Sequence, residues 1–107
     1  MNETVMGSTQ RQIVKVKLIG VLGSAAGQRD VELETTRDLT ISELITTLLS
    51  KFSNAQFRDF LVDSATGDPR PNVIILVNDQ DVNLLGGLKA RVEEEALVTI
   101  IPVAHGG

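Results

Sequence analysis

The sequence predicts an α+β domain in which one principal helix packs across a mixed β-sheet. Three observations predict it: strand-like alternation early in the chain, a capped amphipathic helix in the middle, and an apolar, β-branched strand at the end. This order lets the first and last strands pair in parallel at the centre of the sheet. The length of 107 residues suits one domain, and 42% hydrophobic with 22% charged residues is ordinary globular composition.

The chain divides into three segments by composition. Residues 1–12 are polar without any period and predict a flexible leader. Residues 13–103 hold all the periodic apolar patterns and predict the folded domain. Residues 104–107 follow the last strand, end in Gly-Gly, and predict a flexible tail.

The first two strands are predicted from alternation. In residues 13–19, apolar residues alternate with Lys15 and Lys17, which indicates a strand with one solvated face. A second alternating run occupies residues 31–35 and predicts the other strand of a hairpin. Residues 20–27 lie between them, are rich in glycine and alanine, and predict a turn or loop.

The principal helix is predicted over residues 41–52. Thr40 and Glu43 fit a capping box, in which each side chain accepts a hydrogen bond from a free main-chain N–H at the helix start. The pattern breaks at Asn54, so the helix should end just before it. Apolar residues three and four positions apart make one stripe over three turns: Ile41, Leu44, Ile45, Leu48, Leu49 and Phe52.

The segment after the helix is predicted to cover the core and then re-enter the sheet. Apolar residues at 57–62 predict a short strand or turn. Residues 64–72 contain a glycine and two prolines and predict a loop. Residues 73–77 are continuously apolar and rich in β-branching, which predicts a strand buried on both faces.

The last third of the chain predicts turns and the final strand. Residues 78–81 predict a polar turn, and residues 84–88 a short helical turn and bend whose leucines pack in the core rather than form an exposed partner patch. Residues 93–95 are three glutamates, for which a solvated turn is favoured over a metal or partner site. Residues 97–103 predict the final strand. The whole order is that of the β-grasp arrangement found in ubiquitin.

Composition excludes several classes of function. The chain has no cysteine, which excludes disulfides, thiolate metal sites and cysteine nucleophiles, and its single histidine excludes a multi-histidine metal site. A net charge of −4 argues against nucleic-acid binding by charge alone. No apolar run reaches the roughly 18 residues that cross a bilayer, and no signal-peptide core is present, so a cytoplasmic protein is expected. No catalytic constellation is present, which predicts a protein that is neither an enzyme nor the holder of a bound cofactor.

The end of the chain is the informative feature. Glycine has no Cβ, so Gly106 and Gly107 could thread a narrow tunnel in a partner and present a carboxylate there. The six residues 102–107 could reach about 20 Å in extended form, at roughly 3.3 Å per residue. This carboxylate is the one group that the sequence places for covalent chemistry.

Several segments resemble the β-grasp sulfur carriers and ubiquitin-like proteins that include MoaD, ThiS and the ubiquitin-related modifier. His105 directly before Gly-Gly is closest to the ubiquitin-related modifier. The similarity runs without a gap from Arg70 to Gly107. The other segments that carry it are Arg70-Pro71-Asn72-Val73, Val77-Asn78-Asp79-Gln80-Asp81, Leu84-Leu85-Gly86 and the tail from Ile100.

Two departures from that pattern stand out, and one segment is closer to another member of the group. Val82 occupies the place where the ubiquitin-related modifier typically has tryptophan, which predicts a different surface there. Residues 93–96 replace the usual Asp-Gly-Asp turn. The Ile-Pro-Val segment before the tail is more like MoaD. The mixture suggests an archaeal or bacterial relative.

The resemblance implies a carrier that other enzymes act on. An activating enzyme of the MoeB/ThiF type, which binds ATP and magnesium itself, would adenylate the carboxylate of Gly107. A sulfur donor protein would then form a thiocarboxylate for tRNA thiolation, or a lysine of a target protein would form an isopeptide bond. The enzyme would recognise the tail through Ala104, His105 and Gly106, although a role of His105 in solubility alone stays open. The proteasome is a further implied partner, and the possible acceptor lysines of the chain are Lys15, Lys17, Lys51 and Lys89.

Two other functions stay open. The first is a MoaD-type small subunit of molybdopterin synthase, which donates sulfur in molybdenum cofactor biosynthesis. The second is a β-grasp interaction domain with an inert tail.

Overall fold

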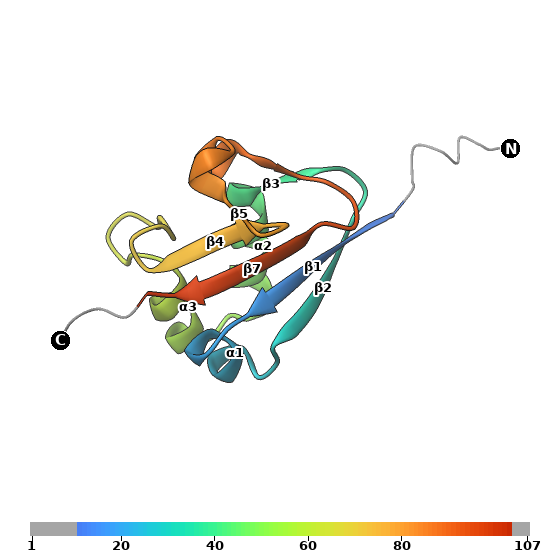
Figure 1. The fold of residues 1–107 in the computed structure, drawn as a ribbon. Helices are drawn as coiled ribbons and strands as arrows, with labels where there is room; N and C mark the ends of the chain where they lie inside the picture. The colour runs from blue at the N-terminus through green and yellow to red at the C-terminus, as the bar shows by residue number, and fades with distance from the viewer. Residues whose placement is uncertain (1–10, 104–107) are drawn as a thin grey trace, which may run out of the picture.

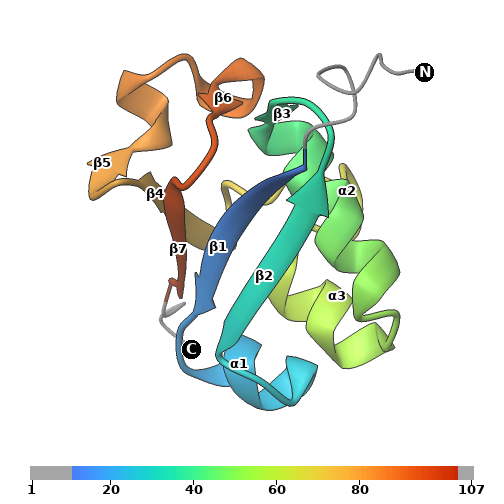
Figure 2. The ribbon, with the colours of Figure 1, turned by 90° about the vertical axis from the view of Figure 1, so that its right-hand side faces the viewer.

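A five-stranded mixed sheet with helices packed against one face forms the body of the structure, a computed structural model that describes residues 11–103 (Figures 1 and 2). The sheet strands are β1 (Gln12–Leu18), β2 (Asp30–Thr35), β4 (Val73–Val77), β5 (Gln80–Asp81) and β7 (Leu97–Pro102). A separate two-stranded sheet pairs β3 (Leu39–Thr40) with β6 (Arg91–Val92). The helices are α1 (Val21–Ala26), α2 (Ile41–Lys51) and α3 (Ala55–Leu61), with 3-10 turns η2 (Val82–Leu84) and η3 (Gly87–Lys89).

The strand order is β2-β1-β7-β4-β5, with the first and last strands in the centre. β1 and β7 pair in parallel, with Lys15 opposite Leu97, and the other pairs in this sheet are antiparallel. The predicted α+β fold with a mixed sheet and one principal helix is therefore confirmed. So is the parallel pairing of the first and last strands.

Helix α2 begins at the predicted capping box. The main-chain N–H of Glu43 donates to Thr40 Oγ1 at 3.1 Å, and the N–H of Thr40 donates to Glu43 Oε1 at 2.9 Å. The helix ends at Lys51, and the N–H of its C-cap residue Phe52 donates to the carbonyl of Leu48. Its apolar stripe faces the sheet, as predicted, and the four residues Ile41, Leu44, Ile45 and Leu48 are buried.

The core lies between α2, α3 and the inner face of the sheet. Of the residues that the structure describes, no charged or polar side chain is buried in it. The fully buried large side chains come from every major element: Val14, Val16, Leu18, Leu22, Val31, Ile41, Leu44, Leu48, Phe57, Leu61, Ile75 and Ile100.

The prediction of a loop over residues 20–27 is wrong, because these residues form α1. Gly20 (φ 58°), the N-cap, and Gly27 (φ 81°), the C-cap, both have a positive φ, and Gly27 is in the left-handed helical conformation typical of helix ends. Between them Leu22 is fully buried, and a Cβ on Gly23 would lie 2.9 Å from the carbonyl oxygen of Leu18. The glycines therefore mark a tightly packed helix and its ends.

The prediction of a strand or turn at 57–62 is also wrong, because α3 occupies most of that segment. Asn54, which breaks the α2 pattern, is the N-cap of this second helix: its Oδ1 accepts from the N–H of Phe57 at 2.7 Å. Phe57 and Leu61, four residues apart, are fully buried, and the ring of Phe52 meets that of Phe57 edge to face at 5.3 Å. With only two turns, the helix has too short an apolar period to identify from sequence.

Two predictions of burial are wrong for residues that prove to be exposed. β4 was predicted to be buried on both faces, but Ile74 is 43% exposed, because the helices cover one face of the sheet and leave the other open. The leucines at 84–88 were predicted to pack in the core, but Leu84 is 81% exposed and Leu85 39%; Leu88 alone is half-buried against the core. Val82 is the buried apolar residue of this segment. The prediction that Val82 changes the surface there is therefore wrong.

Candidate functional site

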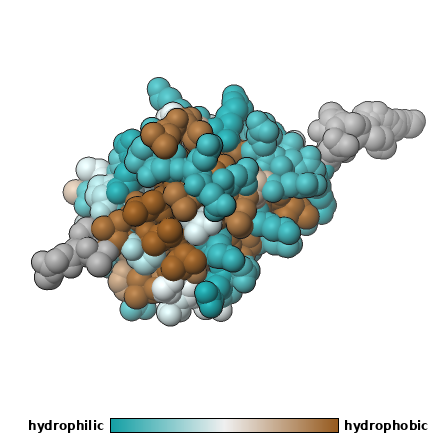
Figure 3. Space-filling view, viewed as in Figure 1, coloured by the Kyte–Doolittle hydropathy of each residue, from teal (hydrophilic) through white to brown (hydrophobic). Residues whose placement is uncertain are grey.

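The open face of the sheet carries an apolar patch where β4 and β7 pair. We call this set the outer patch: Ile74, Leu76, Leu97, Ile101 and Val103. Ile74 lies directly opposite Ile101 in the antiparallel register, so the two isoleucines form its centre. Figure 3 shows apolar side chains gathered over this part of the sheet, close to where the chain leaves β7. Apolar surface of this kind on a small protein indicates a binding surface.

Charged residues border the outer patch in two successive rows. Lys15 and Lys17 lie on the neighbouring strand β1, opposite Leu97 and Thr99 of β7. The next strand, β2, places acidic residues opposite both lysines, Glu32 across from Lys15 and Asp30 across from Lys17. The open face therefore changes from apolar to basic to acidic across the sheet. A partner can use this gradient to fix its orientation.

The end of β7 is anchored on both sides. The N–H of Val103 donates to the carbonyl of Asn72 at 2.9 Å, and the Asn72 amide nitrogen donates to the carbonyl of Asp59 at 3.0 Å. On the other side, the α-carbon of Gly20 lies close to the ring of Pro102. A Cβ added to Gly20 would lie 3.6 Å from Pro102 Cγ. The end of β7 is thus fixed beside the outer patch.

The predicted tail contacts and the predicted attachment site lie outside the described residues. These are Ala104, His105, Gly106 and Gly107. They begin immediately after Val103, whose side chain is 36% exposed and belongs to the outer patch. The same holds for most of the predicted leader: residues 1–10 lie outside the described part of the chain.

Two sequence segments that carried the resemblance have structural roles next to the site. In the first, Arg70 donates to the carboxylate of Asp68 from Nη2 at 2.7 Å and from Nε at 3.0 Å, and its main-chain N–H adds a bond of 2.8 Å. These bonds lower the pKa of Asp68, the side-chain bond from Arg70 being the largest cause. The Arg70–Asp68 bonds stabilise the loop that positions Asn72 beside the end of β7.

The second segment forms the hairpin between β4 and β5. Asn78 (φ 48°) and Asp79 (φ 72°) both have left-handed backbone, as a two-residue type I′ turn requires. Asn78 Oδ1 accepts from the N–H of Leu97 at 3.0 Å, which positions the start of β7. Asp81 Oδ1 then accepts from the N–H of Asn83 at 2.9 Å and caps η2. The hydrogen bonds of Asn78 and Asp81 serve the fold.

The four possible acceptor lysines are all exposed but do not form one cluster. Lys15 and Lys17 lie on the open face of the sheet, and Lys89 lies in η3. Lys51 ends α2, with Nζ 6.0 Å from the centroid of the Phe52 ring. Each ion pair described within residues 11–103 is made by an arginine and not by one of these lysines.

Among residues 11–103, no group of three or more histidine, cysteine or acidic side chains is arranged to hold a metal ion. The three glutamates at 93–95 are exposed, and Glu95 adopts a positive φ of 67° in the turn before β7, as a solvated turn predicts. None of the helices in this part of the chain is long and apolar enough to span a bilayer.

The outer patch is the feature that the sequence did not predict. Residues 73–77 are all apolar, so nothing in that run distinguishes the covered face from the open one. Thr99, the polar residue on the outer side of β7, was the one available signal that this face is not part of the core. Exposure here depends on where the helices pack, which is a tertiary property.

Known proteins share sequence and fold with this chain. A curated relative, "Ubiquitin-related modifier 1 homolog" from Dictyostelium discoideum, is 27% identical over 97 residues, which cover 88% of this chain and 98% of that protein. The solution structure of Urm1 from Trypanosoma brucei matches with a TM-score of 0.72 at 24% identity, covering 92% of this chain and 98% of that one. A chain of the Amycolatopsis orientalis BexX/CysO complex matches with a TM-score of 0.67 at 29% identity, covering 88% and 99%.

The family comparison covers nearly the whole domain and the tail. The model of the Urm1 (Ubiquitin related modifier) family matches residues 13–107, from the first strand to the terminal glycine. Members of this family are protein modifiers and not enzymes. With its ubiquitin-like sheet, its capped helix and its anchored carboxyl-terminal strand, this chain belongs to the Urm1 family of ubiquitin-related modifiers.

Proposed function

We propose that this chain is a protein modifier and sulfur carrier whose carboxyl group at Gly107 is activated by a partner enzyme. The observation that carries the proposal is the outer patch beside the anchored end of β7. An enzyme that binds this patch receives the tail from a fixed point. Docking of the sheet holds the carboxyl group close to the active site, so that a bimolecular step becomes effectively unimolecular.

The chemistry begins with adenylation. A carboxylate oxygen of Gly107 attacks the α-phosphorus of ATP, the bond to the β-phosphate breaks, and pyrophosphate leaves. The product is an acyl-adenylate, which has AMP as a good leaving group where the free carboxylate had none. ATP and magnesium belong to the partner, because this chain supplies only the carboxylate and the surface that docks it.

The adenylate has two onward reactions. In the first, the terminal sulfur of a persulfide on a sulfur donor protein attacks the carbonyl carbon and AMP leaves, which gives an acyl disulfide. A thiol then attacks the donor's own sulfur and forms a disulfide with it, so that a thiocarboxylate is released at Gly107 for tRNA thiolation. In the second, a lysine amine of a target protein attacks, AMP leaves with loss of one proton from nitrogen, and an isopeptide bond forms. We place both reactions in the cytoplasm, with the proteasome as a further partner of conjugated targets.

The activating enzyme is of the MoeB/ThiF type in this proposal. Its tunnel contacts Ala104, His105 and Gly106, and its surface contacts the outer patch. The similarity to a chain of the BexX/CysO complex supports a role that requires a second protein. From Val103, the four tail residues reach about 13 Å in extended form, so the active site must lie within that distance of the docked sheet.

The docking surface is tested with Ile101→Lys, measured by ATP–pyrophosphate exchange with the cognate activating enzyme. A lysine in the middle of the outer patch should lower kcat/KM at least about tenfold, because a buried interface would then hold an unpaired charge. The matched control is Leu84→Lys, which puts the same charge on a side chain that is 81% exposed and lies off the patch. Equal losses in both variants, or none in either, would contradict docking through the patch.

The tail is tested separately in the same assay. Deleting Gly107 should abolish exchange, because the new carboxylate stops about 3.3 Å short of the phosphate, and reacting atoms must approach to roughly 3–3.5 Å. Gly106→Ala should weaken exchange without altering thermal unfolding, because its Cβ must fit inside the tunnel. If both variants exchange as wild type does, the tail is inert and the chain is an interaction domain.

A further inference from the structure

The outer edge of β2 is an unpaired strand edge. β2 is the last strand on its side of the five-stranded sheet, and within residues 11–103 no other strand pairs with its second edge. Figure 2 shows this strand facing outward, with α2 alongside it. Such an edge presents main-chain donors and acceptors that can add a strand from another protein.

The register identifies which main-chain groups face outward. The β1–β2 register ends with Lys17 opposite Asp30. One residue further on, the N–H of Leu18 donates to the carbonyl of Arg29 at 2.7 Å, which continues the register with a hydrogen-bonded pair. Because such pairs alternate in an antiparallel ladder, Val31 and Leu33 also bond to β1, whereas the main-chain groups of Glu32 and Glu34 point to the free edge. Among the hydrogen bonds of the described residues, none outside the ladder uses the main-chain N–H or C=O of these two glutamates.

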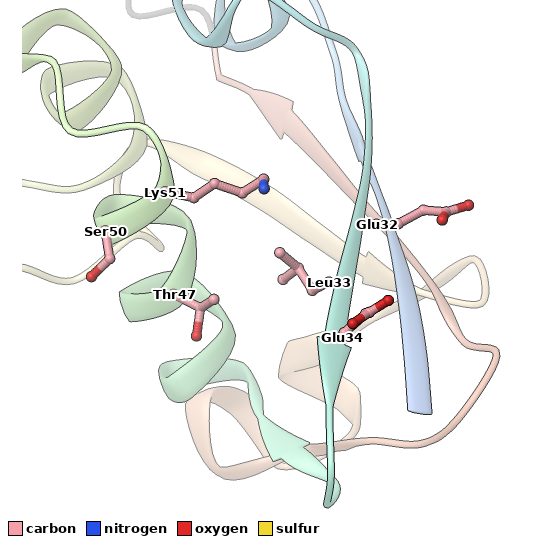
Figure 4. A pocket seen from close by; sticks show the side chains of 6 residues that line it. All are labelled: Glu32, Leu33, Glu34, Thr47, Ser50 and Lys51. Atoms are coloured by element: carbon pink, nitrogen blue, oxygen red, sulfur yellow. The ribbon is translucent and has the colours of Figure 1, made fainter. Parts of the chain in front are cut away.

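A groove runs between this edge and α2 (Figure 4). It has a volume of about 560 Å³. Leu33 points from β2 toward the helix, and Lys51 extends from the end of α2 toward the strand. Glu32 and Glu34 turn the other way, onto the open face of the sheet. An added strand would therefore meet an apolar and lightly basic wall on its inner side, and two carboxylates on its outer side.

The charges indicate which kind of strand fits. On its paired side, Glu32 faces Lys15 of β1, and Glu34 bonds Arg11 at 3.1 Å through one carboxylate oxygen. On the free side, the added strand itself must supply any positive charge. A second copy of β2 would bring glutamates against glutamates, which is destabilising, so the edge disfavours self-pairing.

We propose that the free edge of β2 binds an extended segment of a partner protein with lysine or arginine at positions i and i+2 and a small apolar residue between them. The two basic side chains lie opposite Glu32 and Glu34 on the open face, and the middle residue enters the groove beside Leu33. The site uses neither the outer patch nor the tail. It is therefore independent of the activation chemistry proposed above, and its test needs no activating enzyme.

The test uses the whole chain labelled with nitrogen-15 and the peptide acetyl-Thr-Val-Lys-Val-Lys-Val-Thr-amide. Nuclear magnetic resonance titration should show shifts centred on β2 and the end of α2. Hydrogen exchange at the amides of Glu32 and Glu34 should slow at least about fivefold with the peptide bound, because strand addition engages both N–H groups. Shifts centred on the outer patch or on residues 93–95, or no binding, would overturn the proposal.

Two controls separate main-chain pairing from simple charge attraction. A peptide with glutamate in place of both lysines should bind at least about fivefold more weakly, because two cross-strand ion pairs become two repulsions. A lysine peptide methylated on the main-chain nitrogen of both lysines keeps its charge but loses two donors, and it should also bind at least about fivefold more weakly. If the methylated peptide binds as well as the parent peptide, the contact is electrostatic only and strand addition is wrong.

A charge-reversed chain completes the test. In the double variant Glu32→Lys/Glu34→Lys, both substitutions lie at exposed positions, so the fold should persist as judged by thermal unfolding. This variant should prefer the glutamate peptide over the lysine peptide. An unchanged preference for the lysine peptide would place the binding elsewhere and overturn the proposal.

Discussion

Replacing Leu48 by alanine should remove a large part of the stability of this domain. Leu48 is fully buried in the middle of the α2 stripe. The substitution deletes three carbon atoms, which at about 0.8 kcal/mol per methylene costs about 2.4 kcal/mol in transfer free energy. The cavity that remains adds to this cost, so the expected total is about 3–5 kcal/mol. Domains of this size are stable by only about 5–15 kcal/mol, so the variant should be close to unfolding.

The assay is equilibrium unfolding in urea followed by far-ultraviolet circular dichroism, with thermal unfolding beside it. A loss of about 3 kcal/mol corresponds to a drop in melting temperature of roughly 12–24 °C, at about 4–8 °C per kcal/mol for a domain of this length. Leu84→Ala is the matched control, because it removes the same atoms from a side chain that is 81% exposed. Its free energy of unfolding should change by no more than about 0.5 kcal/mol.

The losses in free energy of unfolding of Leu48→Ala and Leu84→Ala are compared to test whether burial controls stability at these positions. If Leu48→Ala costs less than about 0.5 kcal/mol, then α2 does not bury the stripe that its sequence indicates. If both variants cost the same amount, burial does not control stability at these positions, and the assignment of core and surface leucines is wrong.

Three further predictions concern the caps and the close approach at α1. Thr40→Ala should lower the free energy of unfolding by about 1 kcal/mol in urea titration, because it removes the α2 N-cap; Thr40→Ser should restore most of the loss. The side-chain hydrogen bond from Arg37 and the main-chain N–H of Thr40 lower the pKa of Glu43 from 4.5 to about 2. The stability that Glu43 supplies should therefore be complete above about pH 5 and be lost as the pH falls through 2. If the difference in free energy of unfolding between wild type and Glu43→Gln does not narrow on acidification, this prediction is wrong. Gly23→Ala should destabilise by about 1–3 kcal/mol in thermal unfolding, because its Cβ would lie 2.9 Å from a main-chain oxygen, whereas Ser24→Ala should not.

The parts of the fold that the sequence predicts are those whose signals are local and long enough. The capping box and six-residue stripe fix α2, and the alternating lysines fix both the strand character of β1 and its solvated face. Helices α1 and α3 have six and seven residues, so both are shorter than the window of about 11 residues over which a helical period is recognised. Glycines at 20 and 27 suggested a loop, although their positive φ values serve as helix boundaries.

The candidate site divides in the same way. The terminal glycines are visible in the sequence because they are a covalent feature of the chain. The outer patch is not, because Ile74 and Ile75 are the same residue type and only the packing of α2 and α3 decides that the first is exposed and the second buried. The short strands β3, β5 and β6 have two residues each, which is below the length at which alternation exists.

The pairing of Ile74 with Ile101 has a consequence for which molecules a partner can select. The outer patch exists only when β4 and β7 lie side by side, and β7 in turn needs β1, which is about eighty residues away in sequence. An unfolded or truncated chain can carry the same terminal glycines, but it cannot present the two isoleucines as neighbours. A partner that requires both features therefore discriminates against misfolded copies at the binding step. Strands so distant in sequence also pair slowly, so this surface should form late in folding. Its presence therefore indicates that the chain has completed folding.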